Sequence, residues 1–128
     1  NDLEHLQLSL GAMWAGIPFS PISPAYSLVS ADYGKLRHVL GLLTPGLVYA
    51  ADGAAFARAI DAVLPAGVEV ATRDGVLPGR DATAFDALAA TPVRDVDRAQ
   101  AAVNGDTLAK ILFTSGSTRQ PKAVPTTH

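Results

Sequence analysis

The sequence predicts an α/β fold in which helices alternate with mainly parallel strands. In several segments apolar residues recur every three or four positions, the spacing that places them on one face of a helix. Short apolar runs bounded by glycine and proline separate these segments, which is the pattern of buried strands. Strands alternating with helices of about 10–13 residues imply βαβ units, and therefore a mainly parallel sheet covered by helices.

The first helix is predicted directly after Asp2, a residue type suited to a helix N-terminus, and Gly16 is expected to end it. Its apolar positions are Leu3, Leu6, Leu10, Met13 and Trp14. We expect Trp14 to lie in the core with the others rather than to serve as a cofactor platform. Residues 17–22 are apolar but contain two prolines, which restrict them to an edge strand or an extended loop.

A second helix is expected to begin at Asp32 as its cap and to end before Pro45. Its apolar face comprises Leu36, Val39, Leu40 and Leu43, and its solvated face comprises Lys35, Arg37 and His38. Residues 47–50 then read as a buried strand.

The same order repeats in the following segment. A third helix has one apolar face and is closed by Pro65 and Gly67; that face comprises Phe56, Ile60, Val63 and Leu64. We predict a strand over 68–71, a loop over 75–79, a short helix over 81–90 with Phe85 and Leu88 inward, and a strand over 108–113. The stretch between 91 and 106 is polar, so Asp95 and Asp97 are expected to be solvated.

Composition and charge restrict the class of protein. Hydrophobic residues make up 48% and charged residues 17%, a globular composition. A formal net charge of -2 gives no electrostatic reason to expect nucleic acid or an anionic membrane as a partner. Cysteine is absent, which fits a cytoplasmic chain, and the apolar runs fall short of the roughly 20 residues that span a bilayer. We expect no metal site, because the histidines lack ligand spacing; they are His5, His38 and His128.

Residues 111–128, ILFTSGSTRQPKAVPTTH, place a cluster of hydroxyl groups at the end of a strand. Hydroxyl groups donate hydrogen bonds, glycine allows close approach of the backbone, and a lysine supplies a positive charge. Ligands of open α/β sheets bind at the carboxyl ends of strands, where successive N–H groups can form an anion-binding nest. The pattern therefore favours a phosphate-binding loop over 114–122, formed by Thr114, Ser115, Gly116, Ser117, Thr118 and Lys122.

The main alternative for such a loop is a solvated turn without a ligand. The ordered string of strand, TSGST, two further residues and Pro-Lys is longer than chance clusters of hydroxyl residues. Other phosphate-binding motifs do not fit, because the lysine follows Pro121 rather than the glycine of a Walker loop. The sequence also lacks the GxGxxG of a dinucleotide-binding turn.

The loop resembles TSGSTGxPKG, the phosphate-loop signature of the adenylate-forming (AMP-binding) superfamily, which includes acyl- and aryl-CoA synthetases, luciferases and peptide-synthetase adenylation domains. Residues 15–60 are similar to the early N-terminal region of the feruloyl-CoA synthetase-like group. Together these stretches cover half of the chain. The resemblance implies one partial domain over 1–128, a fragment of the large N-terminal domain of such an enzyme; the start at Asn1 and the stop at His128 agree with this expectation.

Two positions depart from the superfamily signature. Ala123 replaces the glycine after the lysine, as in the feruloyl-type subgroup. Arg119 replaces the second glycine, and if that position needs φ > 0 its side chain costs about 1–2 kcal/mol. Its cation can instead point outward or contact a phosphate. An outward-pointing Arg119 would weaken ATP binding and a phosphate contact would strengthen it, and the sequence does not choose between the two.

The resemblance implies an ATP-dependent carboxylate:CoA ligase that adenylates an aromatic acid such as ferulate and transfers it to coenzyme A. The hydroxyl residues of the loop would bind the β- and γ-phosphates, Gly116 would permit the turn, and Lys122 would neutralise the leaving pyrophosphate. The ligand of Mg2+ and the catalytic lysine would lie beyond His128, so we assign no catalytic residue within this chain and expect no turnover by it alone. The alternatives are an adenylation domain of another branch, such as a peptide synthetase, and a non-catalytic phosphate-binding module. The sequence indicates no oligomeric state.

Overall fold

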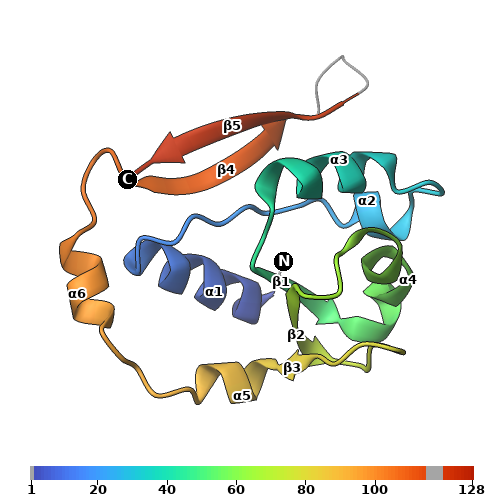
Figure 1. The fold of residues 1–128 in the computed structure, drawn as a ribbon, viewed down its shortest axis with the longest axis horizontal. Helices are drawn as coiled ribbons and strands as arrows, with labels where there is room; N and C mark the ends of the chain where they lie inside the picture. The colour runs from blue at the N-terminus through green and yellow to red at the C-terminus, as the bar shows by residue number, and fades with distance from the viewer. Residues whose placement is uncertain (1, 115–119) are drawn as a thin grey trace. The chain divides into compact units, whose positions relative to one another are not determined.

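The computed structural model describes residues 2–114 and 120–128 (Figure 1). It divides into two compact units. Unit 1 combines the chain up to Ile22 with Pro92–His128, and unit 2 spans Ser23–Thr91. The fold class is α/β, as the sequence predicts, with helices and a parallel three-stranded sheet.

Unit 2 contains a parallel sheet in the order β1-β2-β3. Its strands are β1 (Leu47–Asp52), β2 (Glu69–Asp74) and β3 (Thr83–Ala84). Its helices are α2 (Ala25–Leu28), α3 (Gly34–Leu43), α4 (Gly53–Val63) and α5 (Phe85–Ala89). The predicted strands over 47–50 and 68–71 are confirmed, and α4 connects them as the crossover of a βαβ unit.

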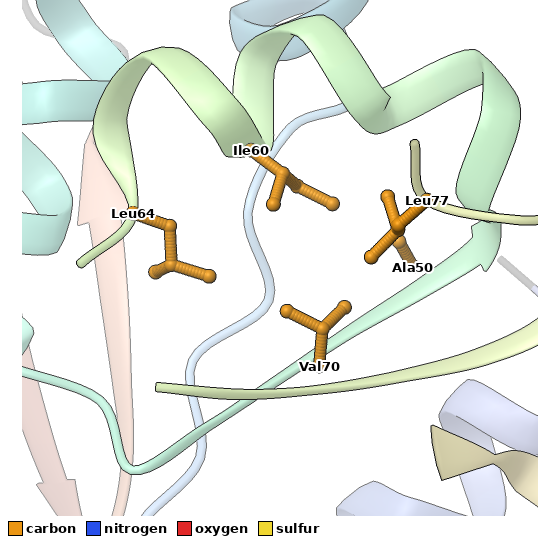
Figure 2. Close-up of a cluster of buried hydrophobic side chains, with 5 residues drawn as sticks. All are labelled: Ala50, Ile60, Leu64, Val70 and Leu77. Atoms are coloured by element: carbon orange, nitrogen blue, oxygen red, sulfur yellow. The ribbon is translucent and has the colours of Figure 1, made fainter. Parts of the chain in front are cut away.

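The core of unit 2 lies between α4 and the sheet. Figure 2 shows Ile60 and Leu64 of the α4 segment pointing toward Val70 of β2. Ala50 of β1 and Leu77 of the following loop complete this cluster, in which Val70 is 1% exposed. The apolar face predicted for the third helix is therefore the face that packs on the sheet.

Local hydrogen bonds set where the helices of unit 2 begin. Asp52 ends β1 and caps α4, because its Oδ1 accepts a hydrogen bond from the Ala55 N–H at 3.1 Å. The sequence predicts Asp32 as the cap of α3, but the N-cap position is Tyr33, at φ 54°; Asp32, one residue earlier, accepts a hydrogen bond from the Gly34 N–H through its Oδ1 at 3.0 Å. That N–H and the Ser30 hydroxyl favour the carboxylate form, which lowers the pKa of Asp32.

The helix predicted over 81–90 is only half right. Residues Thr83–Ala84 instead form β3, because Thr83 pairs with Ala71 of β2 and its hydroxyl donates to Glu69 Oε1 at 2.7 Å. The helix α5 begins only at Phe85, whose ring meets that of Tyr49 edge-on at 6.1 Å between centroids. Residues 81–90 contain too few large apolar side chains for their spacing to distinguish a strand from a helix.

Unit 1 contains two helices and a hairpin. They are α1 (Leu3–Trp14), α6 (Val96–Ala101), β4 (Leu108–Thr114) and β5 (Lys122–Thr127). The first predicted helix is confirmed with its cap, because Asp2 Oδ1 accepts from the His5 N–H at 2.7 Å. The helix α6 lies in the polar stretch where the sequence predicted no element. Asp95 and Asp97 are exposed there as expected.

The predicted burial of α1 is wrong. Its apolar stripe is more than half exposed, and the side chains concerned are Leu3, Leu6, Leu10 and Trp14. Trp14, expected in the core, is 59% exposed, whereas the small Ser9 of the same helix is buried. The period identified which residues share a face, but it holds no information about which face the rest of the chain covers.

Candidate phosphate-binding site

The hairpin of β4 and β5 brings the two ends of the predicted loop together (Figure 1). Its strands are antiparallel, and the last pair of the register joins Thr114 to Lys122. Directly paired residues in a sheet place their side chains on the same face, with Cβ atoms about 4.5–5.5 Å apart. The side chains of Thr114 and Lys122 therefore start from neighbouring positions on one face of the hairpin.

The other residues predicted for the loop lie outside the described residues. They are Ser115, Gly116, Ser117, Thr118 and Arg119. On the described side, Thr114 and Lys122 are both exposed, so their polar groups are open to a ligand. Pro121 is buried beside Lys122 and fixes the point where the chain enters β5. The loop thus begins and ends on ordered strand positions.

Strand β5 was not predicted from the sequence. Pro125 lies in its middle and pairs with Ile111, and a proline normally argues against a strand. It is tolerated because a proline without an N–H can occupy a strand at a sheet edge. The signal available in the sequence was the β-branched residues on either side of this proline, Val124, Thr126 and Thr127. The hairpin also adds an antiparallel pair to a chain for which mainly parallel pairing was expected.

The opposite edge of β4 is paired with the segment that the sequence assigned to an edge strand or extended loop. Phe19 forms a parallel bridge with Lys110, which confirms that prediction. The Phe19 N–H donates to the Ala109 carbonyl at 3.2 Å, and the Ile111 N–H donates to the Phe19 carbonyl at 2.9 Å. The Ser20 hydroxyl donates to the Ile111 carbonyl at 2.6 Å. β4, which leads to the loop, is therefore held on both edges.

In the described part of the chain, β4 ends at the hydroxyl residue Thr114 and the hairpin pairs it with Lys122. Comparison with protein-family models gives a match over residues 1–128 to the model described as AMP-binding enzyme. The chain belongs to the AMP-binding enzyme family. Comparisons with curated proteins and with solved structures gave no match.

Membership of the AMP-binding family supports an adenylate-forming, AMP-forming ligase that uses ATP, typically with Mg2+. Among the residues that the structure describes, no three His, Asp or Glu side chains gather into a group that could hold a metal ion. In the same described ranges, no helix has the length and apolar character that a membrane crossing requires.

Unit 1 also contains a hollow that the described residues of the loop do not line. This shallow hollow of about 600 Å³ is lined by residues of α6 and its approach, including Arg94 and Arg98. Arg98 also forms an ion pair with Asp95, with 3.6 Å between the nitrogen and oxygen. Neither Thr114 nor Lys122 lines this hollow. The structure describes two of the predicted site residues, Thr114 and Lys122, and the hairpin pairs them directly.

Proposed function

We propose that this chain carries the ATP-phosphate-binding loop of an AMP-forming carboxylate:CoA ligase. The observation that supports the proposal most directly is the cross-strand pair of Thr114 and Lys122 in a member of the AMP-binding family. A lysine held beside a hydroxyl group offers a positive charge and a hydrogen-bond donor to the same anion. A phosphate chain is the anion that this sequence pattern suits best.

In the proposed reaction a carboxylate oxygen attacks the α-phosphorus of ATP. The bond from that phosphorus to the bridging oxygen breaks, which releases pyrophosphate and leaves an acyl-adenylate. The thiol of coenzyme A then displaces AMP from the acyl carbon, loses its proton and forms a thioester. Chemistry of this kind depends mainly on positioning and on charge neutralisation. Bound Mg2+ would supply further neutralisation of the phosphate charge.

The loop residues have distinct roles in this proposal. Thr114, with the hydroxyl groups of Ser115, Ser117 and Thr118, binds the β- and γ-phosphates. Gly116 allows the backbone to approach them, and Lys122 neutralises the charge that develops on the leaving pyrophosphate. Arg119 either adds a contact to a phosphate or points away from it. No residue of this chain is assigned to the chemical step.

The proposal also treats residues 1–128 as one part of a larger N-terminal domain, in a cytoplasmic enzyme. The apolar stripe of α1 supports this, since four large apolar side chains at helical spacing are exposed on it. Contiguous apolar patches of this kind commonly mark a surface that another part of the protein covers. The rest of the active site would then come from the same domain.

Pyrophosphate binding tests the loop itself. We expect inorganic pyrophosphate and Mg-ATP to bind the wild-type chain in titration calorimetry, and Lys122→Ala to weaken binding about 10- to 100-fold, the effect of losing one hydrogen bond from a charged group. Lys35→Ala is a matched control, because Lys35 is an exposed lysine of unit 2 that lies over the Tyr26 ring. Equal affinity of Lys122→Ala and wild type, with both shown to be folded by circular dichroism, would contradict the proposal.

The acid substrate and coenzyme A are tested separately, with the longer polypeptide that contains this chain. We expect ferulate to promote exchange of radioactive pyrophosphate into ATP, and coenzyme A to be required for net release of AMP. Exchange promoted by amino acids instead would favour the peptide-synthetase branch. Pyrophosphate binding without exchange for any acid would favour a non-catalytic phosphate-binding module.

A further inference from the structure

Strand β4 forms a short parallel ladder with the segment around Phe19. Its two backbone hydrogen bonds join Phe19 to Ala109 and Ile111, at 3.2 and 2.9 Å. Both segments run toward the carboxyl end of β4, the end at which Thr114 lies. The next hydrogen bond of this ladder would lie one step closer to the phosphate loop.

The backbone cannot make that next hydrogen bond. In a parallel ladder the N–H two residues after Phe19 would donate to the carbonyl of Ile111. That residue is Pro21, which has no N–H. The Ser20 hydroxyl donates to the same carbonyl instead, at 2.6 Å and in a partly buried position. A side chain therefore makes the contact that the proline removes from the backbone.

This contact lies closer to the loop than the two backbone bonds do. Ile111 precedes Thr114 by three residues on the same strand, and Thr114 pairs directly with Lys122. A carbonyl that loses its partner in a partly buried position is costly, so the strand would shift to find another donor. Such a shift would move Thr114 and Lys122 with it.

We propose that Ser20 is a positioning residue for the phosphate site. It does not contact the phosphate; its hydroxyl holds the carboxyl end of β4 where Thr114 and Lys122 face one ligand. The proposal rests on the proposed function, because it assigns to Ser20 a role in the binding of the β- and γ-phosphates. The signal in the sequence is a serine directly before a proline in an extended segment.

Titration of the whole chain with inorganic pyrophosphate tests this role. We expect Ser20→Ala to weaken binding about fivefold, the effect of losing one hydrogen bond of ordinary strength. Ser20→Thr keeps the hydroxyl group and should bind within about twofold of wild type. The double variant Ser20→Ala/Pro21→Ala supplies a backbone N–H at residue 21, and this N–H should restore most of the lost affinity. A role limited to general stability would instead lower the free energy of unfolding of Ser20→Ala and leave the pyrophosphate affinity of the folded chain unchanged.

A matched control is Ser9→Ala. The Ser9 hydroxyl also donates to a backbone carbonyl in unit 1, that of His5 at 2.8 Å, but it lies in α1 rather than against β4. Ser9→Ala should therefore leave pyrophosphate affinity unchanged. If Ser20→Ala does not fold, Ser20→Cys replaces it, since a thiol is a weaker donor of similar size and should also weaken binding.

The outcomes separate this inference from the function on which it rests. Wild-type affinity in Ser20→Ala or its cysteine replacement, together with weakened binding in Lys122→Ala, would overturn the role of Ser20 and leave the proposed function in place. Weakened binding in Ser20→Ala without rescue by Pro21→Ala would also overturn it, because the missing hydrogen bond would not be the cause. No pyrophosphate binding by the folded wild-type chain would overturn both.

Discussion

Two leucines illustrate the difference between the units. Leu64, at the end of α4 in unit 2, is 6% exposed and packs in the core against the sheet. Leu10, in α1 of unit 1, is 54% exposed. Both leucines follow another large apolar residue by four positions, Ile60 before Leu64 and Leu6 before Leu10. Periodicity therefore establishes that a helix has an apolar face, whereas burial depends on whether another element lies over that face.

The largest effect is expected from the buried leucine. Leu64→Ala should lower the free energy of unfolding by about 2–4 kcal/mol, because it removes apolar contacts and leaves a cavity. Leu10→Ala should change it by less than about 1 kcal/mol, since its side chain is already largely in water. Urea unfolding followed by circular dichroism measures both. Similar losses in the two variants would show that α1 is covered after all.

Two glycines of one loop in unit 2 differ in how closely their surroundings are packed. Gly75 and Gly79 both have φ of 77°, where a side chain is strained, but only Gly75 is crowded. A Cβ there would lie 2.8 Å from Asp52 Oδ1 and 2.9 Å from the Ala54 nitrogen. We expect Gly75→Ala to cost about 2–3 kcal/mol and Gly79→Ala about 1 kcal/mol in thermal unfolding. Equal costs would mean that the loop does not pack on the start of α4.

Removal of a helix cap should have a similar effect on stability in the two units. Asp52 caps α4 in unit 2 and Asp2 caps α1 in unit 1, each by accepting a hydrogen bond from a backbone N–H three residues on. A cap acts locally, so Asp52→Ala and Asp2→Ala should each cost about 1 kcal/mol in chemical unfolding. A negligible effect of Asp2→Ala would indicate that α1 contributes little to the stability of unit 1.

The sequence predicted elements best where the apolar period was long. Ile60 and Leu64 marked one face of a helix between two apolar strands, and that face packs on the sheet. The pattern failed in short segments, where few apolar positions are available. The helix α6 has only six residues and was not predicted. Strand β5 was not predicted because Pro125 lies within it. Burial of Trp14 could not be predicted, because it depends on contacts between distant parts of the chain.

The candidate site rests on hydroxyl residues and a lysine that follow an apolar strand in the sequence, and its residues remain a prediction. The structure describes two of them, Thr114 and Lys122, and pairs them across a hairpin. Their arrangement could not be predicted, because the pairing of Thr114 with Lys122 depends on a hairpin register that includes a proline. The contact of Ser20 with β4 could not be predicted either, because Ser20 and Ile111 lie 91 positions apart in the sequence. Local patterns therefore suggest which residues form the site, whereas long-range pairing determines how the described ones are arranged.

The most direct test of the proposed phosphate loop is an NMR titration of the isotope-labelled chain with inorganic pyrophosphate. We expect the largest amide shifts at Thr114 and Lys122 and in the residues between them, and smaller shifts along β4 and β5. The amides of the unit 2 core, such as Val70, should not move. Shifts centred instead on Arg94 and Arg98 of the unit 1 hollow would contradict phosphate binding at the loop. The absence of amide shifts at saturating pyrophosphate would contradict it too.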